Sequence, residues 1–306
     1  MHYRPLGRTG LKVSVIGIGT WQYGGEWGEP FSQAAVDAIL DAAAEQGVNL
    51  IDTAECYGDH LAERRIGDYL ARRRRSDWVV ASKFGHHFHG PFQRSQHWQP
   101  REVLGQLEAS LRALRSERIE LYQFHSGADS VFFNDELWQL LRDQQQAGKI
   151  GHLGVSVDKN GNPAQVQAAA GVGAAALQVV YNRLQRGAEQ HALPQAQADG
   201  LGVLARVPLA SGYLSGKYAP GATFGDHDVR HQHDAASVQG WLREAQQVAR
   251  DEVPKGVPIA QWALAWCLRN PAVASVIPGC KSPQQARQNA SAAHLLDAHG
   301  QWRVSQ

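Results

Sequence analysis

The sequence predicts an α/β fold in which parallel strands and helices alternate and close into a (β/α)8 TIM barrel. Eight short, nearly continuous apolar runs alternate with segments of helical period along the 306 residues. This alternation favours a parallel sheet covered by helices. No linker rich in Pro, Gly or Ser divides the chain, and eight such units favour a closed barrel over an open sheet. We therefore expect a single domain over residues 1–306 with an N-terminal β-hairpin.

Strands are expected where apolar and β-branched residues stand together between turn residues. Residues 2–14 form the expected hairpin, because the turn Gly7–Gly10 separates two short extended runs. The eight barrel strands are expected at Val15–Thr20, Asn49–Ala54, Trp78–Phe84, Ile119–His125, Ile150–Val157, Leu177–Asn182, Val203–Leu209 and Val273–Ile277.

Helices are expected where apolar side chains recur every three or four residues, as Val103, Leu107, Leu111 and Leu114 do. Pro100 stands at the first position of that helix, where its missing N–H leaves no bond unmade. The helical segments are Ser32–Gln46, His60–Arg73, Pro100–Leu114, Asp135–Ala147, a helix from Pro163, Pro194–Asp199, Gly240–Asp251, Pro258–Arg269 and Pro283–His294.

Charge, cysteine content and hydropathy argue against several classes of protein. The 30 Lys and Arg residues against 29 Asp and Glu give a net charge of +1, so no field favours nucleic acid or an anionic membrane. The longest apolar run, Val13–Trp21, is far shorter than the roughly 20 residues of a membrane helix. Three cysteines without a CxxC pair argue against a disulfide framework, and a cytoplasmic location is expected.

An open nucleotide-binding sheet would carry a glycine-rich fingerprint after its first strand. Here Gly17-Ile-Gly19 is followed by Thr20, Trp21 and Gln22, without the third glycine or the acidic residue of that fingerprint. A dinucleotide would therefore bind by another route.

Four polar residues end or follow three consecutive strands: Asp52, Tyr57 in the turn after it, Lys83 and His125. A barrel carries its chemistry at the carboxyl ends of its strands, so we expect these side chains to meet. A tyrosine, with an ordinary pKa of about 10, exchanges protons poorly at neutral pH, and a nearby ammonium lowers that pKa. Asp52 would hold Lys83 charged, and His125 would donate a hydrogen bond to a carbonyl or tune the proton transfer. Such a site suits protonation of an oxygen while hydride reaches its carbon, or the reverse.

Each of these residues also has a purely structural interpretation. Asp52 and Lys83 could form a structural ion pair, Tyr57 an aromatic cap and His125 a hydrogen-bonded surface group. Their joint occurrence on one rim of the expected barrel favours the catalytic interpretation.

Further motifs in the same order cover nearly the whole chain. They are Asp52-Thr-Ala-x-x-Tyr57-Gly, Lys83, His125, Gly154-Val-Ser156, Gln178-x-x-Tyr-Asn182, Pro208-Leu-Ala-Ser-Gly-Tyr-Leu-Ser-Gly-Lys217, and Ile277-Pro-Gly-x-Lys281-Ser-Pro-x-Gln285 through Asn289. This set resembles the aldo-keto reductase family. The resemblance implies a (β/α)8 barrel, NADPH as hydride donor and reversible reduction of aldehydes or ketones to alcohols. It makes Tyr57 the general acid, tuned by Lys83 and Asp52, with His125 orienting the carbonyl.

The resemblance also implies where NADPH or NADP+ would lie. Ser156 and Gln178 would hydrogen-bond the nicotinamide carboxamide. The segment Ser282–Gln285 resembles a capping box that opens a helix, and the free N–H groups of that helix would bind the adenosine phosphate. Lys281 would pair with a 2′-phosphate, or it is a solvated loop lysine. The expected cofactor contacts are Gly19, Thr20, Trp21, Asp52, Ser156, Gln178, Arg206, Pro208, Leu209, Lys217, Gly279, Lys281, Gln285 and Asn289.

Several positions depart from the family pattern. Arg206 stands where many relatives carry an aromatic residue that stacks on the nicotinamide, and a guanidinium plane can stack as well. Val157 replaces a common asparagine. Gly279 and Gln285 stand where many relatives have basic groups, so use of NADH also remains possible.

Two expected loops are rich in histidine, one after Lys83 and one after strand seven. Imidazole and carboxylate groups can bind zinc, but the spacing matches no structural zinc site, so we expect no metal. We expect the loop after strand seven to fold over the pyrophosphate as a mobile lid. The histidines are His86, His87 and His89 in the first loop and His227, His231 and His233 in the second.

The loops on the same rim are also rich in aromatic residues, which would suit an apolar or sugar-like aldehyde. These residues are Trp21, Trp27, Phe88, Phe92 and Trp98.

Two other functions stay open at this point. One is a cofactor-binding regulatory subunit with little turnover, as some members of the resembled family act beside channels. The other is a metal-dependent barrel hydrolase, which chelation would inactivate. The expected partner is a small carbonyl or alcohol substrate, with no nucleic acid and no membrane, and the sequence leaves the oligomeric state open.

Overall fold

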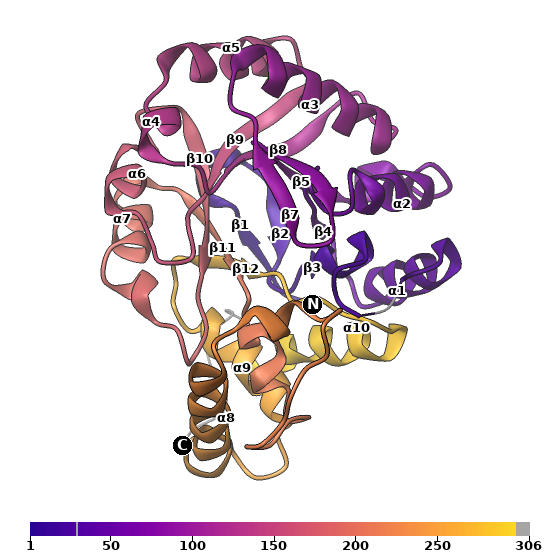
Figure 1. Cartoon of the computed structure of the whole chain (residues 1–306), viewed down its shortest axis with the longest axis vertical. Coiled ribbons are helices and arrows are strands. Elements are labelled where there is room, and N and C mark those ends of the chain that lie inside the picture. Colours follow the sequence, from indigo (N-terminus) through magenta and orange to yellow (C-terminus); the bar gives the residue numbers. More distant parts are fainter. Residues whose placement is uncertain (29, 298–306) are drawn as a thin grey trace.

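The computed structural model, which describes residues 1–28 and 30–297, confirms the predicted barrel and its N-terminal hairpin (Figure 1). The hairpin pairs β1 (Tyr3–Pro5) with β2 (Lys12–Ser14). The barrel strands are β3 (Ile18–Gly19), β4 (Leu50–Asp52), β5 (Val79–Phe84), β8 (Ile119–His125), β9 (Ile150–Ser156), β10 (Ala174–Val180), β11 (Gly202–Arg206) and β12 (Val273–Val276).

These eight strands form one parallel sheet in the order β12-β11-β10-β9-β8-β5-β4-β3. Parallel bridges between Ile16 and Val276 and between Gly19 and Gly279 join the last strand to the first. Gly19 leaves no room for a side chain at this seam, because an added Cβ would lie 2.7 Å from the carbonyl oxygen of Ile277. The sheet is thereby closed on itself.

Helices surround the sheet (Figure 1). They are α1 (Gln33–Glu45), α2 (Leu61–Leu70), α3 (Pro100–Ala113), α4 (Asp129–Phe132), α5 (Asp135–Gln146), α6 (Pro163–Ala168), α7 (Ala192–Asp199), α8 (Ala235–Asp251), α9 (Ile259–Leu268) and α10 (Pro283–Ala290). Helix α8 begins at Ala235 rather than at the predicted Gly240, because Asp234 accepts a 2.8 Å hydrogen bond from the Ser237 N–H and caps it. Within the described ranges, no helix combines the length and the apolar character needed to cross a bilayer.

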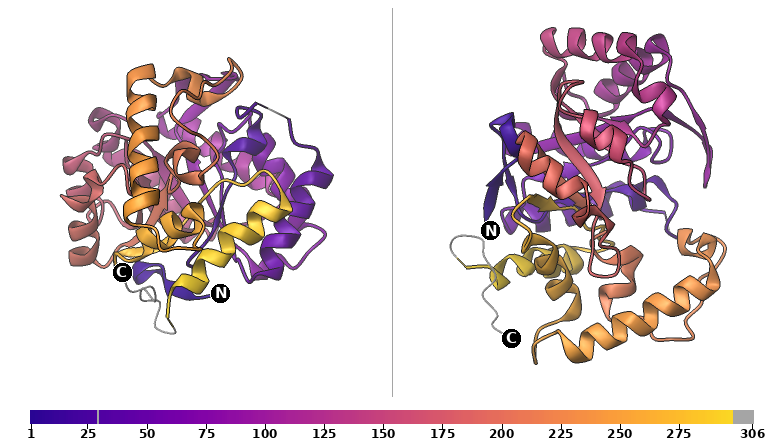
Figure 2. Two further views of the ribbon diagram at one scale, coloured as in Figure 1. Left: turned by 90° about the horizontal axis from the view of Figure 1, so that it is seen from below. Right: turned by 90° about the vertical axis from the view of Figure 1, so that its left-hand side faces the viewer.

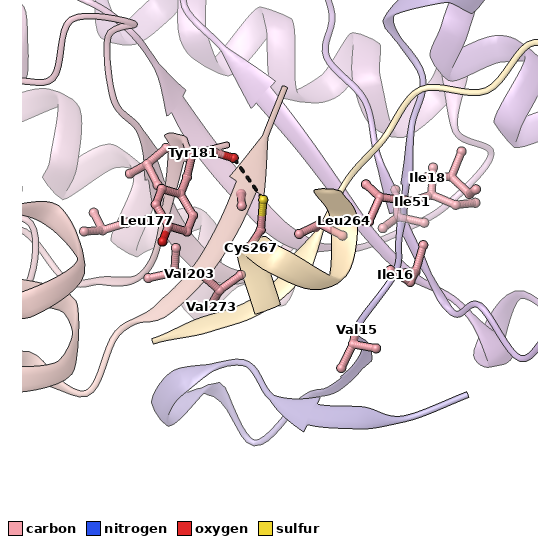
Figure 3. Packing of buried hydrophobic residues seen from close by; sticks show 14 of the residues in the cluster. Val15, Ile16, Ile18, Ile51, Leu177, Tyr181, Val203, Leu264, Cys267 and Val273 are labelled. Atoms are coloured by element: carbon pink, nitrogen blue, oxygen red, sulfur yellow. Dashed lines mark hydrogen bonds between the residues drawn. The ribbon is translucent and has the colours of Figure 1, made fainter. Parts of the chain in front are cut away.

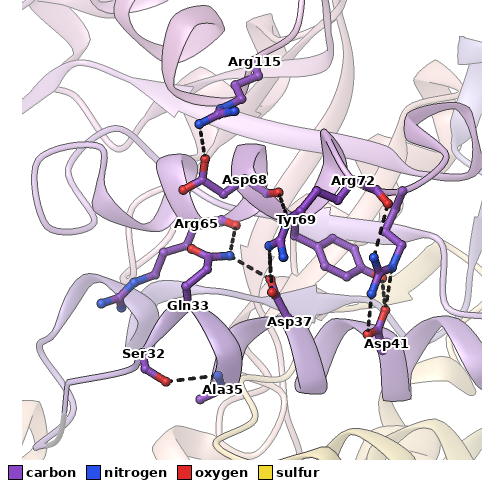
Figure 4. A network of polar contacts seen from close by, with 11 residues as sticks. Ser32, Gln33, Ala35, Asp37, Asp41, Arg65, Asp68, Tyr69, Arg72 and Arg115 are labelled. Carbon is purple, nitrogen blue, oxygen red and sulfur yellow. Dashed lines mark hydrogen bonds and ion pairs between the residues drawn. The ribbon is translucent and has the colours of Figure 1, made fainter.

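Polar contacts fix α1 against α2 on the outside of the barrel (Figure 4). Ser32 caps α1 by accepting a hydrogen bond from Ala35 N–H. Asp37 of α1 pairs with Arg72 just beyond α2, with N and O 2.7 Å apart, and the Tyr69 hydroxyl donates to Asp41. Such exposed pairs each contribute up to about 1 kcal/mol, so they set the position of the helices more than they stabilise the fold.

The larger apolar core lies between the strands and the helices (Figure 3). Helix α9 packs there with Leu264 and Cys267 buried, and the Cys267 thiol donates to the Tyr181 carbonyl oxygen at 3.4 Å. A smaller core fills the barrel interior, and it consists of Leu6, Val13, Leu50, Val79, Ala81, Leu121, Ala176, Leu204, Ala274 and Ile277.

The N-terminal hairpin closes one end of the barrel with Leu6 and Val13. Its turn lies so close to β11 that a Cβ on Gly7 would stand 2.1 Å from the Gly202 nitrogen. The loops that follow the strands lie on the opposite side of the molecule (Figure 2). Catalytic residues of this fold are therefore expected at the open end only.

Side chains of a strand alternate between its two faces, and this period places polar groups inside the open end. On the strand face that points into the barrel, apolar residues are followed two positions later by a polar side chain. The apolar residues are Leu50 of β4, Ala81 of β5 and Leu121 of β8. The polar side chains placed in this way are Asp52, Lys83, Gln123, Gln178 and Arg206.

The predicted loop after Lys83 is instead an antiparallel hairpin of β6 (His86–Gly90) and β7 (Gln93–Gln96). Phe92 turns the chain with a positive φ of 63°. The hairpin stands at the open end, where its side chains contribute to the site described next.

Candidate active site

Three polar side chains meet at the open end of the barrel. Lys83 Nζ donates to Asp52 Oδ1 at 2.7 Å, to the Thr53 carbonyl oxygen at 2.7 Å and to Tyr57 Oη at 3.3 Å. Asp52 and Lys83 are 3% and 0% exposed, whereas Tyr57 lines a cleft. The structure therefore brings a buried ion pair into contact with a phenol that other molecules can reach.

The free oxygen of Asp52 is held by two amides. Gln178 Nε2 donates to Asp52 Oδ2 at 2.7 Å and Gln123 Nε2 at 3.3 Å, and Gln178 Nε2 also lies 3.2 Å from Gln123 Oε1. Sequence reasoning missed Gln123, although it precedes His125 by two residues and so shares its strand face. Gln178 directs its amide Nε2 to Asp52 and Gln123, so only its Oε1 would be left to accept from a nicotinamide carboxamide.

Burial decides the acidity of Tyr57. It raises the pKa of the phenol to about 12, although Lys83 acts to lower it, and Asp52 adds to the rise. Lys83 acts in the expected direction, but the expected net lowering of the pKa of Tyr57 is wrong, because desolvation outweighs the ammonium. Burial also opposes the charge on Lys83, but Asp52 and Tyr57 outweigh it and raise the pKa of the ammonium. At neutral pH Tyr57 keeps its proton and Lys83 its charge.

His125 stands next to Tyr57, with ring centroids 6.4 Å apart. Burial and the positive groups around it hold its pKa well below the usual range, so the ring is neutral. The Cys56 Sγ lies 3.9 Å from His125 Nδ1, and burial raises the pKa of that thiol, which keeps its proton. With the thiol as donor, Nδ1 accepts and the ring proton is on Nε2.

A cleft of about 500 Å³ runs from Tyr57 to the start of α10. This volume lies in the range of cofactor and ligand sites. The expected site residues that line it are Gly19, Thr20, Trp21, Asp52, Tyr57, His125, Gln178, Arg206, Pro208, Leu209, Lys217, Gly279, Lys281, Gln285 and Asn289. Among the expected residues, Lys83 and Ser156 do not line it.

Several buried polar atoms have no hydrogen-bond partner in the described part of the chain, and two of them belong to residues expected at the cofactor site, Ser156 Oγ and Arg206 Nε. Arg206 is held by its Nη2, which donates to the Val157 carbonyl oxygen at 3.0 Å. Buried polar groups are rarely left without partners, so these two atoms fit a polar ligand. A nicotinamide carboxamide is such a ligand, and the residues present are compatible with the dinucleotide.

The start of α10 matches the prediction in part. Ser282 caps the helix by accepting from the Gln285 N–H at 3.2 Å, and Pro283 is its first residue. The Gln285 side chain accepts from the Lys281 N–H at 2.8 Å instead of from Ser282, so the reciprocal half of the capping box is replaced. Lys281 Nζ donates to the Trp27 carbonyl oxygen at 2.6 Å.

The segment after β11 forms one wall of the cleft with an unusual backbone. Val207, Ala210 and Ser211 all have positive φ, at 55°, 48° and 55°. Such conformations cost free energy and persist where surrounding contacts hold them. Asn182 Nδ2 supplies one, since it donates to the Val207 carbonyl oxygen at 3.0 Å.

The loop after β11 also reaches across the cleft. Asp228 forms an antiparallel bridge with Trp27, in the loop after β3. The Arg230 guanidinium lies over the rings of Phe224, Tyr218 and Trp27, 4.1, 4.7 and 5.7 Å from their centroids. Sequence reasoning treated this loop as a lid but did not identify Arg230 as its anchor.

The histidine-rich segments do not gather metal ligands in the described ranges. The one group of three potential ligands found there is Glu55, Cys56 and His125, with atoms within 4.8 Å of one another. His87 and His89 stack on each other with centroids 5.0 Å apart. The hydrogen-bonded group of ionisable side chains at this end of the barrel is that of Tyr57, Lys83 and Asp52.

Comparisons with known proteins agree with this geometry. The profile of the Aldo/keto reductase family matches residues 15–300. An uncharacterized oxidoreductase, YrpG of Bacillus subtilis (strain 168), is 31% identical, over 96% of this chain and 92% of its own. The solved holo form of aldo-keto reductase AKR11C1 from Bacillus halodurans has a TM-score of 0.79 at 28% identity, covering 95% of this chain and 90% of that one. A probable voltage-gated potassium channel subunit beta of Oryza sativa subsp. japonica is 29% identical, over 97% and 92% of the two chains. The chain belongs to the aldo/keto reductase family.

Proposed function

We propose that this protein catalyses the NADPH-dependent, reversible reduction of aldehydes or ketones to alcohols, with Tyr57 as the proton donor. Family membership supports carbonyl reduction in general. The single observation that carries the finer proposal is the contact of the Tyr57 hydroxyl with Lys83, which in turn is paired with Asp52. A cleft that joins this phenol to the N-terminus of α10 supports a dinucleotide as the second reactant.

The residues act by holding and moving one proton. Bound NADPH would supply a hydride to the carbonyl carbon. Tyr57, which is protonated at neutral pH, donates its hydroxyl proton to the carbonyl oxygen. The ammonium of Lys83, 3.3 Å away, stabilises the phenolate that remains. Asp52 keeps that ammonium charged and in place.

His125 orients the substrate in this proposal. Its Nε2–H, set by the thiol at Nδ1, donates to the carbonyl oxygen that Tyr57 protonates. Because the ring is neutral, it polarises the carbonyl without competing as an acid. Trp21 stacks on Tyr57 with centroids 6.1 Å apart and helps to exclude water from the phenol.

The test is NADPH oxidation with a panel of aldehydes and ketones, followed by absorbance, for the parent protein and Tyr57→Phe. The variant should lose about 100-fold to 10,000-fold in kcat with NADPH affinity nearly unchanged, since the hydroxyl is removed and the ring stays. Equal kcat values for both proteins would refute the role of Tyr57. Repeating the panel with NADH measures the cofactor preference.

A second candidate is a cofactor-binding regulatory subunit with little turnover. The similarity to a probable potassium channel subunit beta favours it. Tight NADPH binding, measured by fluorescence, together with no oxidation by any carbonyl in the panel would support this function over the enzyme. Three free cysteines are consistent with the cytoplasmic location that we propose for either.

A further inference from the structure

Arg94 of β7 enters the same cleft as Tyr57 and His125. Its Nη2 donates to the carbonyl oxygen of Cys56, the residue before Tyr57, at 3.4 Å. The side chain is 21% exposed, so part of the guanidinium remains accessible. A cation on the β6–β7 hairpin therefore contacts the backbone of the residue that precedes the proposed proton donor in the sequence.

Glu26 fixes this guanidinium in position. It is 1% exposed and accepts from Arg94 Nη2, from Trp21 Nε1 at 2.6 Å and from the Phe92 N–H at 2.7 Å. These contacts join the loop after β3 to the hairpin, and they hold Arg94 before any ligand arrives. A cation that is already ordered loses little freedom when it binds an anion.

The guanidinium keeps donors that the protein does not use. Arginine has five N–H groups, and the two on Nη2 go to Glu26 and Cys56. Nε and Nη1 of Arg94 make none of the hydrogen bonds found within residues 1–28 and 30–297, although the Cys56 side chain also interacts with this guanidinium. Planar pairs of such donors match the two oxygens of a carboxylate.

The charged groups nearest to Tyr57 leave room for one anion; Lys217, Arg230 and Lys281, which also line the cleft, are counted apart. Three cations, Lys83, Arg94 and Arg206, face two carboxylates, Asp52 and Glu26, which leaves a net charge of +1. The remaining titratable neighbours, His86, His125 and Glu55, add no charge at neutral pH. Burial lowers the pKa of the two histidines, which are neutral, and raises the pKa of the Glu55 carboxyl to about 8, so that it keeps its proton.

We propose that Arg94 forms an anion subsite beside Tyr57 that selects carbonyl substrates carrying a carboxylate. The proposal rests on the proposed carbonyl reduction and names its substrate class, aldehydo or keto acids. The carbonyl oxygen would lie at Tyr57 and His125 while the carboxylate accepts from Nε and Nη1 of Arg94. Trp21, stacked on Tyr57, would line the path between them.

The kinetic test compares matched pairs: glyoxylate, succinic semialdehyde and para-carboxybenzaldehyde, each against its methyl ester. These acids set the carboxylate at increasing distance from the carbonyl. The parent protein should prefer at least one acid over its ester in kcat/KM, and Arg94→Gln should reduce that ratio by about 10-fold to 100-fold. The ratio is the readout because a folding defect would lower both substrates alike.

Two further variants sharpen the result. Glu26→Gln removes the competing carboxylate and should raise the acid-to-ester ratio, the opposite of Arg94→Gln. Arg101→Gln removes an exposed arginine that does not line the cleft, and its ratio should equal that of the parent. Turnover of the esters with no preference for any acid, or equal ratios in the parent and Arg94→Gln, would overturn the subsite while leaving the proposed reductase intact.

A binding measurement decides the subsite without turnover. Monomethyl terephthalate and dimethyl terephthalate are titrated calorimetrically into the protein with and without NADP+. Both probes offer an ester carbonyl to Tyr57 and His125, so their difference reports the carboxylate that only the monoester carries. The monoester should bind about tenfold tighter to the parent and lose that advantage in Arg94→Gln. Equal affinities in the parent would refute the subsite, whereas a lack of oxidation of NADPH by any carbonyl would refute the reductase.

Discussion

The buried pair of Asp52 and Lys83 allows a quantitative test. Asp52→Asn keeps the size of the side chain but replaces a carboxylate that accepts from Lys83 and from the amides of Gln178 and Gln123. The new amide nitrogen must face at least one of these donors, and Lys83, which is 0% exposed, loses its counter-charge. Removing one partner of a buried ion pair costs about 3–5 kcal/mol. Against a typical unfolding free energy of about 5–15 kcal/mol, this loss is readily measured.

The assay is urea unfolding followed by tryptophan fluorescence and circular dichroism, for the parent, Asp52→Asn, Lys83→Met and the double variant. Each single variant leaves one buried charge alone, whereas the double variant removes both. The double variant should therefore cost less than the sum of the singles, by about 2 kcal/mol or more. If each single change costs less than about 0.5 kcal/mol and the double change is additive, the pair is not coupled as the geometry indicates.

Three other predictions concern the rim of the site. Burial raises the pKa of Glu55 from about 4.5 to about 8, so between these two pH values the folded protein keeps a proton that the unfolded chain has lost. The free energy of unfolding should therefore fall by up to about 1.4 kcal/mol per pH unit over this range as the pH rises. Glu55→Gln should flatten that slope, as measured by urea unfolding at several pH values. Lys281→Ala should reduce the kcat/KM preference for NADPH over NADH by about tenfold, and an unchanged ratio would show that this lysine does not read the 2′-phosphate. Cys56→Ala should lower kcat by about tenfold and alter the pH–rate profile, because His125 loses the donor that sets its tautomer. Cys56→Ser, which keeps a donor, should restore both. If Cys56→Ala has the same pH–rate profile as the parent, the thiol does not set the tautomer of His125.

The barrel could be predicted because its strands are apolar on both faces and stand between clear turn residues. The β6–β7 hairpin could not, since its strands are polar and only partly buried and carry no apolar alternation. Its position depends on Glu26, which contacts Phe92 and Arg94, residues 66 and 68 positions further along the chain. Contacts of that separation leave no local pattern in a single sequence.

The central site residues could be predicted because each ends a strand or directly follows one, on the rim where parallel strands converge. Gln123 lies within an apolar strand, so its polarity alone does not mark it as a site residue, although counting two residues back from His125 finds it. The acidity of Tyr57 depends on how much water reaches the phenol, and no spacing along the chain contains that quantity. The roles of the site residues stay predictions until the variants above are measured.

The seam between Gly19 and Gly279 has a consequence for how the protein is made. The first strand of the barrel leaves the ribosome long before its partner strand, so one sheet edge stays unpaired during most of synthesis. Unpaired edges recruit other chains, and pairing partners so distant in sequence form slowly. Nascent or truncated chains that lack residues 273–279 should therefore depend on chaperones and aggregate when these are depleted.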